Sequence, residues 1–191
     1  DEGKVDPKAE MLITVAWPDN NPDDVDTYVE DPGGNVIWYK QREGGLMHID
    51  RDDRGMYKDV ILFNGIEVTN PLNQEIISFR GLEDGEYVVN VVHYIANGTA
   101  PLPVTVKVEK LNPSVKVIFY QTLNLTGTGN EQTAVRFTLK GEDVIDVNNT
   151  PKSLVELTRG GGGKASSARG GGPGFIDATT GLATGSTVKK P

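Results

Sequence analysis

Two acidic segments carry the side chains best able to do chemistry in this chain. The first is DDVDTYVEDPGGN at 23–35, and the second is HIDRDDRG at 48–55. Calcium is bound in proteins by roughly six to eight oxygen ligands, and carboxylates gathered without a cation repel one another. These segments therefore predict a calcium site. Its candidate ligands are Asp24, Asp26, Asp31, Asp50 and Asp52.

The spacing of the first segment suggests how the two could meet. Asp24 and Asp26 are two residues apart, so on a β-strand both project from one face while Val25 points inward. If residues 35–40 and 46–50 pair as a hairpin, carboxylates from both segments meet at one end of the sheets. The hypothesis thus requires Asp24 and Asp26 to lie close to Asp50 or Asp52.

An ordinary structural interpretation of the same acids remains open. Asp31 stands directly before Pro-Gly-Gly, and an aspartate in that position often starts a turn by bonding to the backbone. In the second segment, Arg51 and Arg54 can neutralise the neighbouring carboxylates. On this interpretation Asp31 starts a turn, and the acids of the second segment lie in a solvated loop whose arginines neutralise them.

The residues needed for the common catalytic machines are missing. There are no cysteines, only two histidines (His48 and His93), and no Gly-x-Ser-x-Gly elbow. The GGGGK run at 160–164 is followed by Ala165, not by the Ser or Thr of a phosphate-binding loop. One enzymatic alternative remains, a glycosidase that uses paired carboxylates. We expect a non-catalytic protein.

Three aromatic residues offer a different kind of site. Trp17, Trp38 and Tyr39 could form a flat platform for a carbohydrate. Aromatic residues on strands more often fill the core or pair across strands, and we favour that interpretation. A carbohydrate-binding module remains an alternative.

Net charge and hydrophobic composition exclude some classes of binding partner. The 191 residues carry a formal net charge of −8 and no basic stripe, which argues against a nucleic-acid partner. No run of about eighteen apolar residues is present, so we expect no membrane span in this chain. The chain begins at Asp1 in a polar segment, and we expect that a signal peptide or membrane anchor preceded it.

The elements that position these residues are β-strands. Short alternating or β-branched stretches recur between Gly, Pro, Asn and Asp, a pattern typical of an all-β domain. The expected strands are 10–17, 25–30, 35–40, 58–63, 74–80, 86–95, 103–109, 115–123, 132–140 and 142–146. We predict a single antiparallel β-sandwich, immunoglobulin-like or jelly-roll-like, of about eight to ten strands.

The strand at 86–95 is apolar on both faces, which predicts a central strand. Asp84-Gly85 before it is a strong signal for a tight turn. We expect Trp17, Val25, Val89 and Val91 in the core.

Composition also divides the chain. We predict an N-terminal linker at 1–8, the sandwich at 9–149 and an extended Gly-rich tail at 150–191.

The order of short motifs resembles the YfaP-like family of uncharacterised bacterial and phage β-sandwich domains, often associated with von Willebrand A-type domains. The resemblance spans roughly residues 10–147. The segments that carry it are the strand ending in Trp17, the Asp-x-Asp at 24–26, the Asp-Pro-Gly-Gly at 31–34, the Gly-Gly at 44–45, the acids at 50–52 and the strand from Gly85 to Tyr94. The segment MHIDRDDRGMYKD is more charged than is usual in that family.

The resemblance implies a non-enzymatic domain outside the cytoplasm, periplasmic or secreted, with a cation site among its clustered acids. We therefore expect a structural or interaction module, extracytoplasmic or on a virion, with protein partners and self-assembly. The alternative within this class is a subunit of a phage virion or filament whose Gly-rich tail docks on a neighbour.

Overall fold

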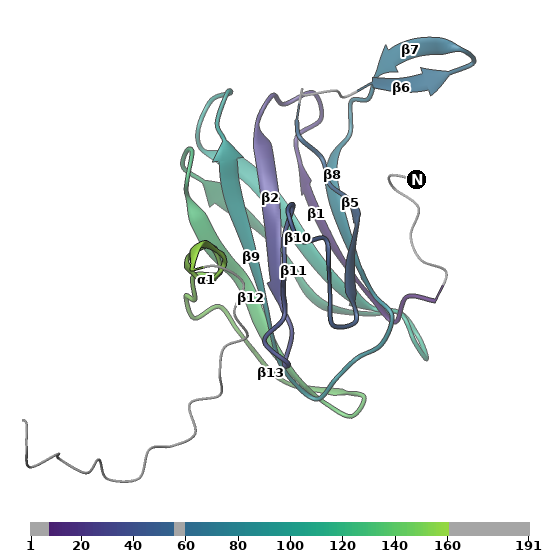
Figure 1. Cartoon of the computed structure of the whole chain (residues 1–191), viewed down its shortest axis with the longest axis vertical. Helices are drawn as coiled ribbons and strands as arrows, with labels where there is room; N and C mark the ends of the chain where they lie inside the picture. The colour runs from purple at the N-terminus through teal and green to yellow at the C-terminus, as the bar shows by residue number, and fades with distance from the viewer. Residues whose placement is uncertain (1–7, 56–59, 161–191) are drawn as a thin grey trace, which may run out of the picture.

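Two antiparallel sheets face each other and enclose one main core (Figure 1). The computed structural model describes residues 8–55 and 60–160. The architecture confirms the predicted all-β sandwich. Among the described residues, no helix is long and apolar enough to cross a membrane.

The larger sheet contains six strands. These are β1 (Met11–Trp17), β4 (Glu43–Gly44), β5 (Met47–Arg51), β8 (Asn73–Phe79), β10 (Leu102–Lys110) and β11 (Lys116–Leu125). Their order across the sheet is β11-β10-β1-β8-β5-β4, with every pair antiparallel. The two acidic segments are thus not joined through a 35–40 with 46–50 hairpin, because β5 pairs with β8 and with the short β4.

The smaller sheet contains five strands. These are β2 (Asp24–Glu30), β3 (Val36–Ile37), β9 (Gly85–Ile95), β12 (Glu131–Lys140) and β13 (Asp143–Asn148). Their order is β13-β12-β9-β2-β3. The strand predicted to be central, β9, lies in the middle of this sheet. The edge strands β11 and β13 both leave one side of their backbone without a strand partner in the described chain.

The core follows from period-two alternation on the facing strands. Along β1, Met11, Ile13, Val15 and Trp17 are buried while the residues between them are half-buried. The four residues expected in the core, Trp17, Val25, Val89 and Val91, all lie in the main buried cluster. That part of the prediction is confirmed.

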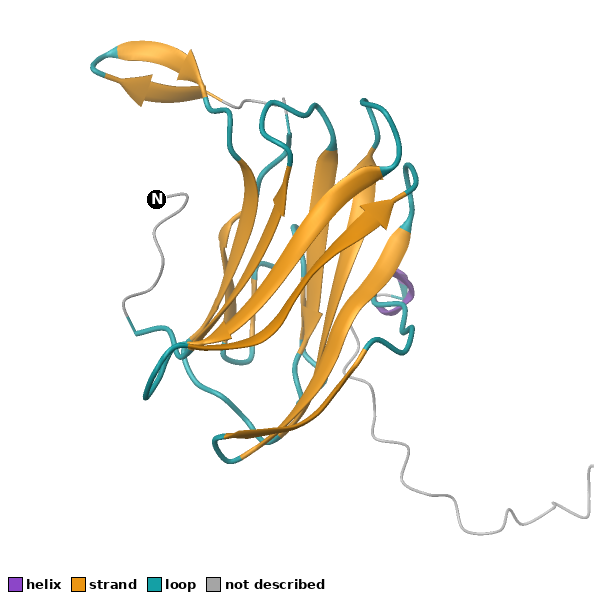
Figure 2. Ribbon diagram, turned by 180° about the vertical axis from the view of Figure 1, so that it is seen from behind, coloured by secondary structure: helices purple, strands orange, loops and turns teal. Residues whose placement is uncertain are grey.

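A separate hairpin projects from the sandwich (Figures 1 and 2). It consists of β6 (Val60–Phe63) and β7 (Ile66–Thr69), joined by Asn64-Gly65. Both turn residues have positive φ, 52° and 79°, as the tightest hairpin turns require. The predicted strand at 58–63 overlaps β6, whereas β7 was not predicted.

The packed chain ends later than the predicted boundary at residue 149. Leu154 is fully buried against Tyr28, Val88 and Val92 on the outer face of the smaller sheet, and helix α1 (Val155–Arg159) follows it. The buried Leu154 side chain and the hydrogen bond from the Leu154 amide to Glu131 hold this segment on the sheet. The division by composition missed it, because a single leucine before a Gly-rich stretch does not stand out. Residues 161–191 of the predicted tail lie outside the described residues, as do residues 1–7 of the predicted linker.

Candidate cation site

The acidic site lies where β2 has an open edge. Strand β3 pairs only with Val29 and Glu30, so the first half of β2 has no strand on that side in the described chain. Glu75 of β8 reaches this edge from the other sheet. Its Oε2 accepts a hydrogen bond of 2.7 Å from the Thr27 amide. The Glu75 carboxylate thus accepts the hydrogen bond that the Thr27 amide would otherwise donate to a neighbouring strand.

Three carboxylates converge at this edge. Asp26, Asp52 and Glu75 are all buried, and one carboxylate oxygen from each lies within 4.8 Å of the other two. Two oxygens that share a calcium ion at about 2.4 Å are separated by at most about 4.8 Å. The spacing of the triad is therefore compatible with a single hard cation held between the three side chains.

The electrostatics of the site oppose ionisation of its acids. Burial, together with the charges of Asp24 and Asp52, raises the pKa of Asp26 to about 8. Burial and the charges of Asp52 and Asp53 raise the pKa of Asp24 to about 6. Burial and the charge of Asp26 also hold the pKa of Glu75 well above its ordinary value.

One basic group lies among these acids. The Arg54 guanidinium acts against the raised pKa values of Asp24 and Asp26, and its Nε lies 3.7 Å from Asp52 Oδ2. Its side chain is 56% exposed, so water screens much of its effect. The site is therefore under-neutralised by the charges that the described chain supplies.

Two carboxylate oxygens in the site have no hydrogen-bond partner among the described residues. They are Oδ1 of Asp24 and Oδ2 of Asp26, and both atoms are buried, on residues only 9% and 3% exposed. An unsatisfied buried acceptor costs about 1–3 kcal/mol, and more when it is charged. A bound proton or a bound cation removes that cost, and these are the two chemical options that the site offers.

A pocket connects the acids to solvent. It has a volume of about 660 Å³ and an open mouth. Its lining residues are Pro22, Asp24, Asp26, Tyr39, Asp52, Arg54, Tyr94, Ile95 and Asn97. A small ion can thus reach Asp26 and Asp52 without opening the sandwich.

The structure brings together some of the predicted ligands. Asp26 and Asp52, from the two acidic segments, lie in one cluster, and Asp24 is electrostatically coupled to both. Asp50 is not part of the three-carboxylate group. A β-bulge separates it from Asp52: Ile49 lies opposite Ile77 and Arg51 opposite Ile76, so Asp50 is the extra residue. The bulge changes the alternation, and residues 50 and 52 no longer share a face.

Asp31 is the other predicted ligand that lies apart. It follows the far end of β2, and its carboxylate accepts hydrogen bonds from the backbone amide and the side-chain amide of Asn35, each 2.8 Å long. The turn interpretation therefore describes Asp31 better than the cation interpretation. We leave Asp31 and Asp50 out of the candidate site.

The interpretation that arginines neutralise the second acidic segment holds for Asp53, which lies next to the site. Asp53 accepts hydrogen bonds from Arg51, from the Gly55 amide and from the Gln74 amide. These bonds fold the loop after β5 and hold it beside β8. Asp53 thus positions Asp52, while Asp52 itself has only the distant, exposed Arg54 as its described ionic partner.

Glu75 is the ligand candidate that the sequence analysis missed. On β8 it lies in phase with Ile77 and Phe79, both fully buried. The sequence did contain a signal for Glu75: it is an acid at a position where the alternation of β8 calls for an apolar residue. A buried carboxylate needs a hydrogen-bond donor or a cation as its partner.

A second buried polar pair was also missed. Asp23 and His93 are both fully buried, and His93 Nε2 lies 2.9 Å from Asp23 Oδ2. The other oxygen, Oδ1, accepts hydrogen bonds from the amides of Asn97 and Gly98. The Asp23 backbone oxygen accepts a bond from Trp17 Nε1. Asp23 therefore organises the end of the sandwich next to the acids and serves a structural role.

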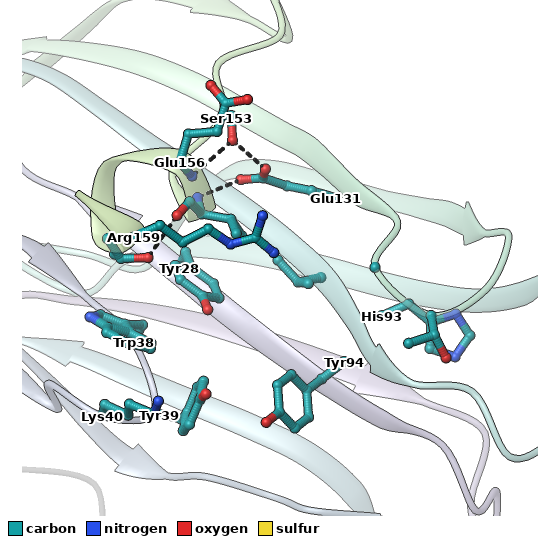
Figure 3. Close-up of a pocket in the computed structure, with 15 residues that line it drawn as sticks. Tyr28, Trp38, Tyr39, Lys40, His93, Tyr94, Glu131, Ser153, Glu156 and Arg159 are labelled. Carbon is teal, nitrogen blue, oxygen red and sulfur yellow. Dashed lines mark hydrogen bonds between the residues drawn. The ribbon is translucent and has the colours of Figure 1, made fainter. Parts of the chain in front are cut away.

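An aromatic pocket adjoins the acidic one on the outer face of the smaller sheet. It has a volume of about 550 Å³ and shares Tyr39 and Tyr94 with the acidic pocket. Tyr28 stacks on Trp38 at 5.6 Å between ring centroids, and Tyr39 lies between Trp38 and Tyr94. Figure 3 shows these four rings on one side and Glu131, Ser153 and Glu156 beside α1 on the other.

This arrangement distinguishes the three aromatic residues of the expected core or cross-strand set, because Trp38 stacks across strands on Tyr28 of β2. Trp17 is in the main core, as expected, but Trp38 and Tyr39 are only half-buried and lie outside that core. Ile37 points inward and is fully buried, so alternation turns Trp38 outward.

Comparison of the chain with protein families, with curated proteins and with solved structures found no match.

Proposed function

We propose that the chain is a non-catalytic β-sandwich interaction module stabilised by calcium. The observation that supports this most strongly is the triad of Asp26, Asp52 and Glu75, whose buried oxygens lie within 4.8 Å of one another. Calcium fits the chemistry because all the available ligands are hard carboxylate oxygens and the pocket leaves room for water to complete the shell. The resemblance to an extracytoplasmic family supports a location outside the cytoplasm or on a virion.

The role of the ion in this proposal is to stabilise the fold. A ligand that binds only the folded state at about one hundred times its dissociation constant adds about 2.7 kcal/mol. For a domain of roughly this size that amounts to a rise in melting temperature of about 5–10 °C. The ion replaces the protons that the crowded acids otherwise retain.

Thermal melting with calcium and with a chelator tests the proposal. The full chain should melt several degrees higher in millimolar calcium than in EDTA, and the variants D26N and E75Q should lose that difference. D143N is the matched control, because Asp143 is an exposed acid on the edge strand β13. Wild-type protein that melts at the same temperature in calcium and in EDTA would sink the cation proposal.

A second candidate function is carbohydrate binding at the aromatic pocket. The observation that favours it is the partial exposure of Trp38, Tyr39 and Tyr94 in one concave site, beside Glu156 and Arg159. Flat aromatic faces stack on the apolar faces of sugar rings, and neighbouring charged groups can bond to the hydroxyls.

Glycan binding is tested by an array screen followed by titration of any hit. Loss of binding in W38A and Y39A, with binding retained in Y120A on the opposite sheet, is the expected result. Binding that is equal in all three variants would place the ligand elsewhere. Absence of any hit among diverse glycans would count against this candidate and leave the calcium proposal untouched.

A further inference from the structure

The projecting β6–β7 hairpin is mostly apolar and exposed. All eight of its strand residues are exposed. Cross-strand pairing places Ile61 opposite Val68 and Phe63 opposite Ile66, so these four side chains share one face of the hairpin. Their exposed fractions are 47%, 37%, 64% and 66%. On the other face Leu62, opposite Glu67, is 74% exposed.

Such a hairpin is not expected to be stable as an isolated feature. Two strands without a third strand or a helix beneath them are marginally stable in water. Large exposed apolar patches on soluble proteins generally mark interaction surfaces. With about 150–200 Å² for each fully exposed large apolar side chain, the apolar residues of this hairpin expose on the order of 600 Å². A stable interface buries about 800 Å² per partner, so the hairpin is large enough to supply most of one side.

The chain also carries a surface that fits such an arm. Strand β11 is the edge of the six-stranded sheet and pairs only with β10 among the described strands. It is ten residues long and has one charged residue, Lys116. Val117 and Tyr120 on it are 52% and 66% exposed. Edge strands are normally protected by charges, bulges or a cover, because an unprotected edge pairs with another strand. Lys116 and a bulge at Ile118 protect only the start of β11, and residues 119–125 follow in regular register with no charged residue.

We propose that the β6–β7 hairpin of one copy adds to the β11 edge of a second copy of this chain. The backbone of the hairpin continues the six-stranded sheet, and its apolar side chains cover Val117 and Tyr120. Because arm and edge are different surfaces, each copy offers both, and the contact propagates from head to tail.

The charge of the hairpin argues against an anionic lipid surface. Residues 60–69 contain Glu67 and no basic residue, and the whole chain carries a net charge of −8. Anionic membranes attract basic segments and repel acidic ones. A second copy presents a ten-residue β-edge, long enough to pair with either four-residue strand of the hairpin, which a membrane does not.

Sedimentation of the full chain over a range of concentrations tests the self-association. We expect wild-type protein to form oligomers as concentration rises and F63T/I66T to weaken association by more than about tenfold. Threonine favours strands, as phenylalanine and isoleucine do, so the hairpin keeps its strand propensity, and the Asn64-Gly65 turn is unchanged. L157Q, which removes an exposed apolar side chain from α1, should associate like the wild type. A wild-type monomer at all concentrations, or equal association of F63T/I66T, overturns the proposal.

Complementation identifies the receiving edge. In V117K/Y120E the new lysine lies opposite Glu109 and the new glutamate opposite Lys107, so both new charges have an oppositely charged neighbour on β10. This variant should also associate less than the wild type, because its edge is charged. A mixture of this variant with F63T/I66T should form one-to-one dimers, because one copy retains the arm and the other the edge. Failure of the mixture to dimerise would overturn β11 as the receiving surface. Flotation of a monomeric wild type with phosphatidylcholine vesicles, lost in F63T/I66T, would assign the hairpin to lipid and overturn the proposal.

Discussion

Replacing Asp26 with asparagine separates the two ways in which the acidic site can be satisfied. Asparagine resembles the protonated aspartic acid in shape and charge, but it is a much weaker calcium ligand. The variant should therefore tolerate the absence of calcium better than the wild type and should respond little to its presence.

The size of the effect follows from the pKa of Asp26. Its value is about 8 in the folded protein and 3.8 as the ordinary value, so the folded state binds a proton more tightly than the unfolded state. The stability from this group is fully present below about pH 4 and is lost as pH rises towards 8. One such proton changes the free energy of unfolding by about 1.4 kcal/mol per pH unit. Between pH 5 and pH 7 the wild type in EDTA should lose about 3 kcal/mol through Asp26 alone.

Urea unfolding at pH 5, 6 and 7 provides the assay, with tryptophan fluorescence as the signal. Trp17 is 4% exposed in the core and becomes solvated on unfolding. In EDTA the decline in stability from pH 5 to pH 7 should be smaller in D26N than in the wild type by about 3 kcal/mol. In saturating calcium the wild type should instead hold or gain stability as pH rises, because the ion binds the deprotonated acids.

Two results would refute this reasoning. Identical pH dependence of D26N and the wild type in EDTA would mean that Asp26 ionises normally in the folded protein. Equal stabilisation of D26N and the wild type by calcium would mean that Asp26 is not a ligand. D143N, with its exposed acid, should match the wild type in every condition.

Three further predictions concern the structure around the site. Asp23→Ala should lower the free energy of unfolding by about 3–5 kcal/mol in urea titrations, because buried His93 and two amides lose their acceptor; a loss below about 1 kcal/mol would contradict the structural role assigned to Asp23. Glu131→Gln should speed hydrogen exchange at Leu154, whose amide bonds to the carboxylate, and unchanged exchange there would show that the segment is held otherwise. Gly55→Ala should cost about 2 kcal/mol or more in the same titration, since φ is +59° and a Cβ would lie 2.6 Å from the Asp23 backbone oxygen; wild-type stability would contradict that crowding.

Much of the fold was accessible from the sequence because alternation is a local signal. The strands from Met11 to Trp17 and from Gly85 to Ile95 appear almost as expected. Strand partners are not local: β5 pairs with β8 across the inserted hairpin, and no pattern within either strand specifies that choice. The hairpin itself had a local signal in Asn64-Gly65, which stands between two apolar runs.

The candidate site was predictable only in part. The convergence of Asp26 with Asp52 follows the expected meeting of the two acidic segments. The exclusion of Asp50 depends on one bulge near the end of β5, between Ile49 and Arg51, which leaves no clear mark in the sequence. Glu75 comes from a third segment, and its role depends on the open edge of β2, a property of the assembled sheets.

The bond between Glu75 and the Thr27 amide has a mechanical consequence. It ties β8 of one sheet to β2 of the other with a side chain, at a corner where no backbone ladder joins the two layers. A force that slides one sheet past the other loads this bond and the neighbouring acids together. If calcium binds as proposed, it would hold Asp26 of β2 and Glu75 of β8 together and so strengthen the same tie between the sheets.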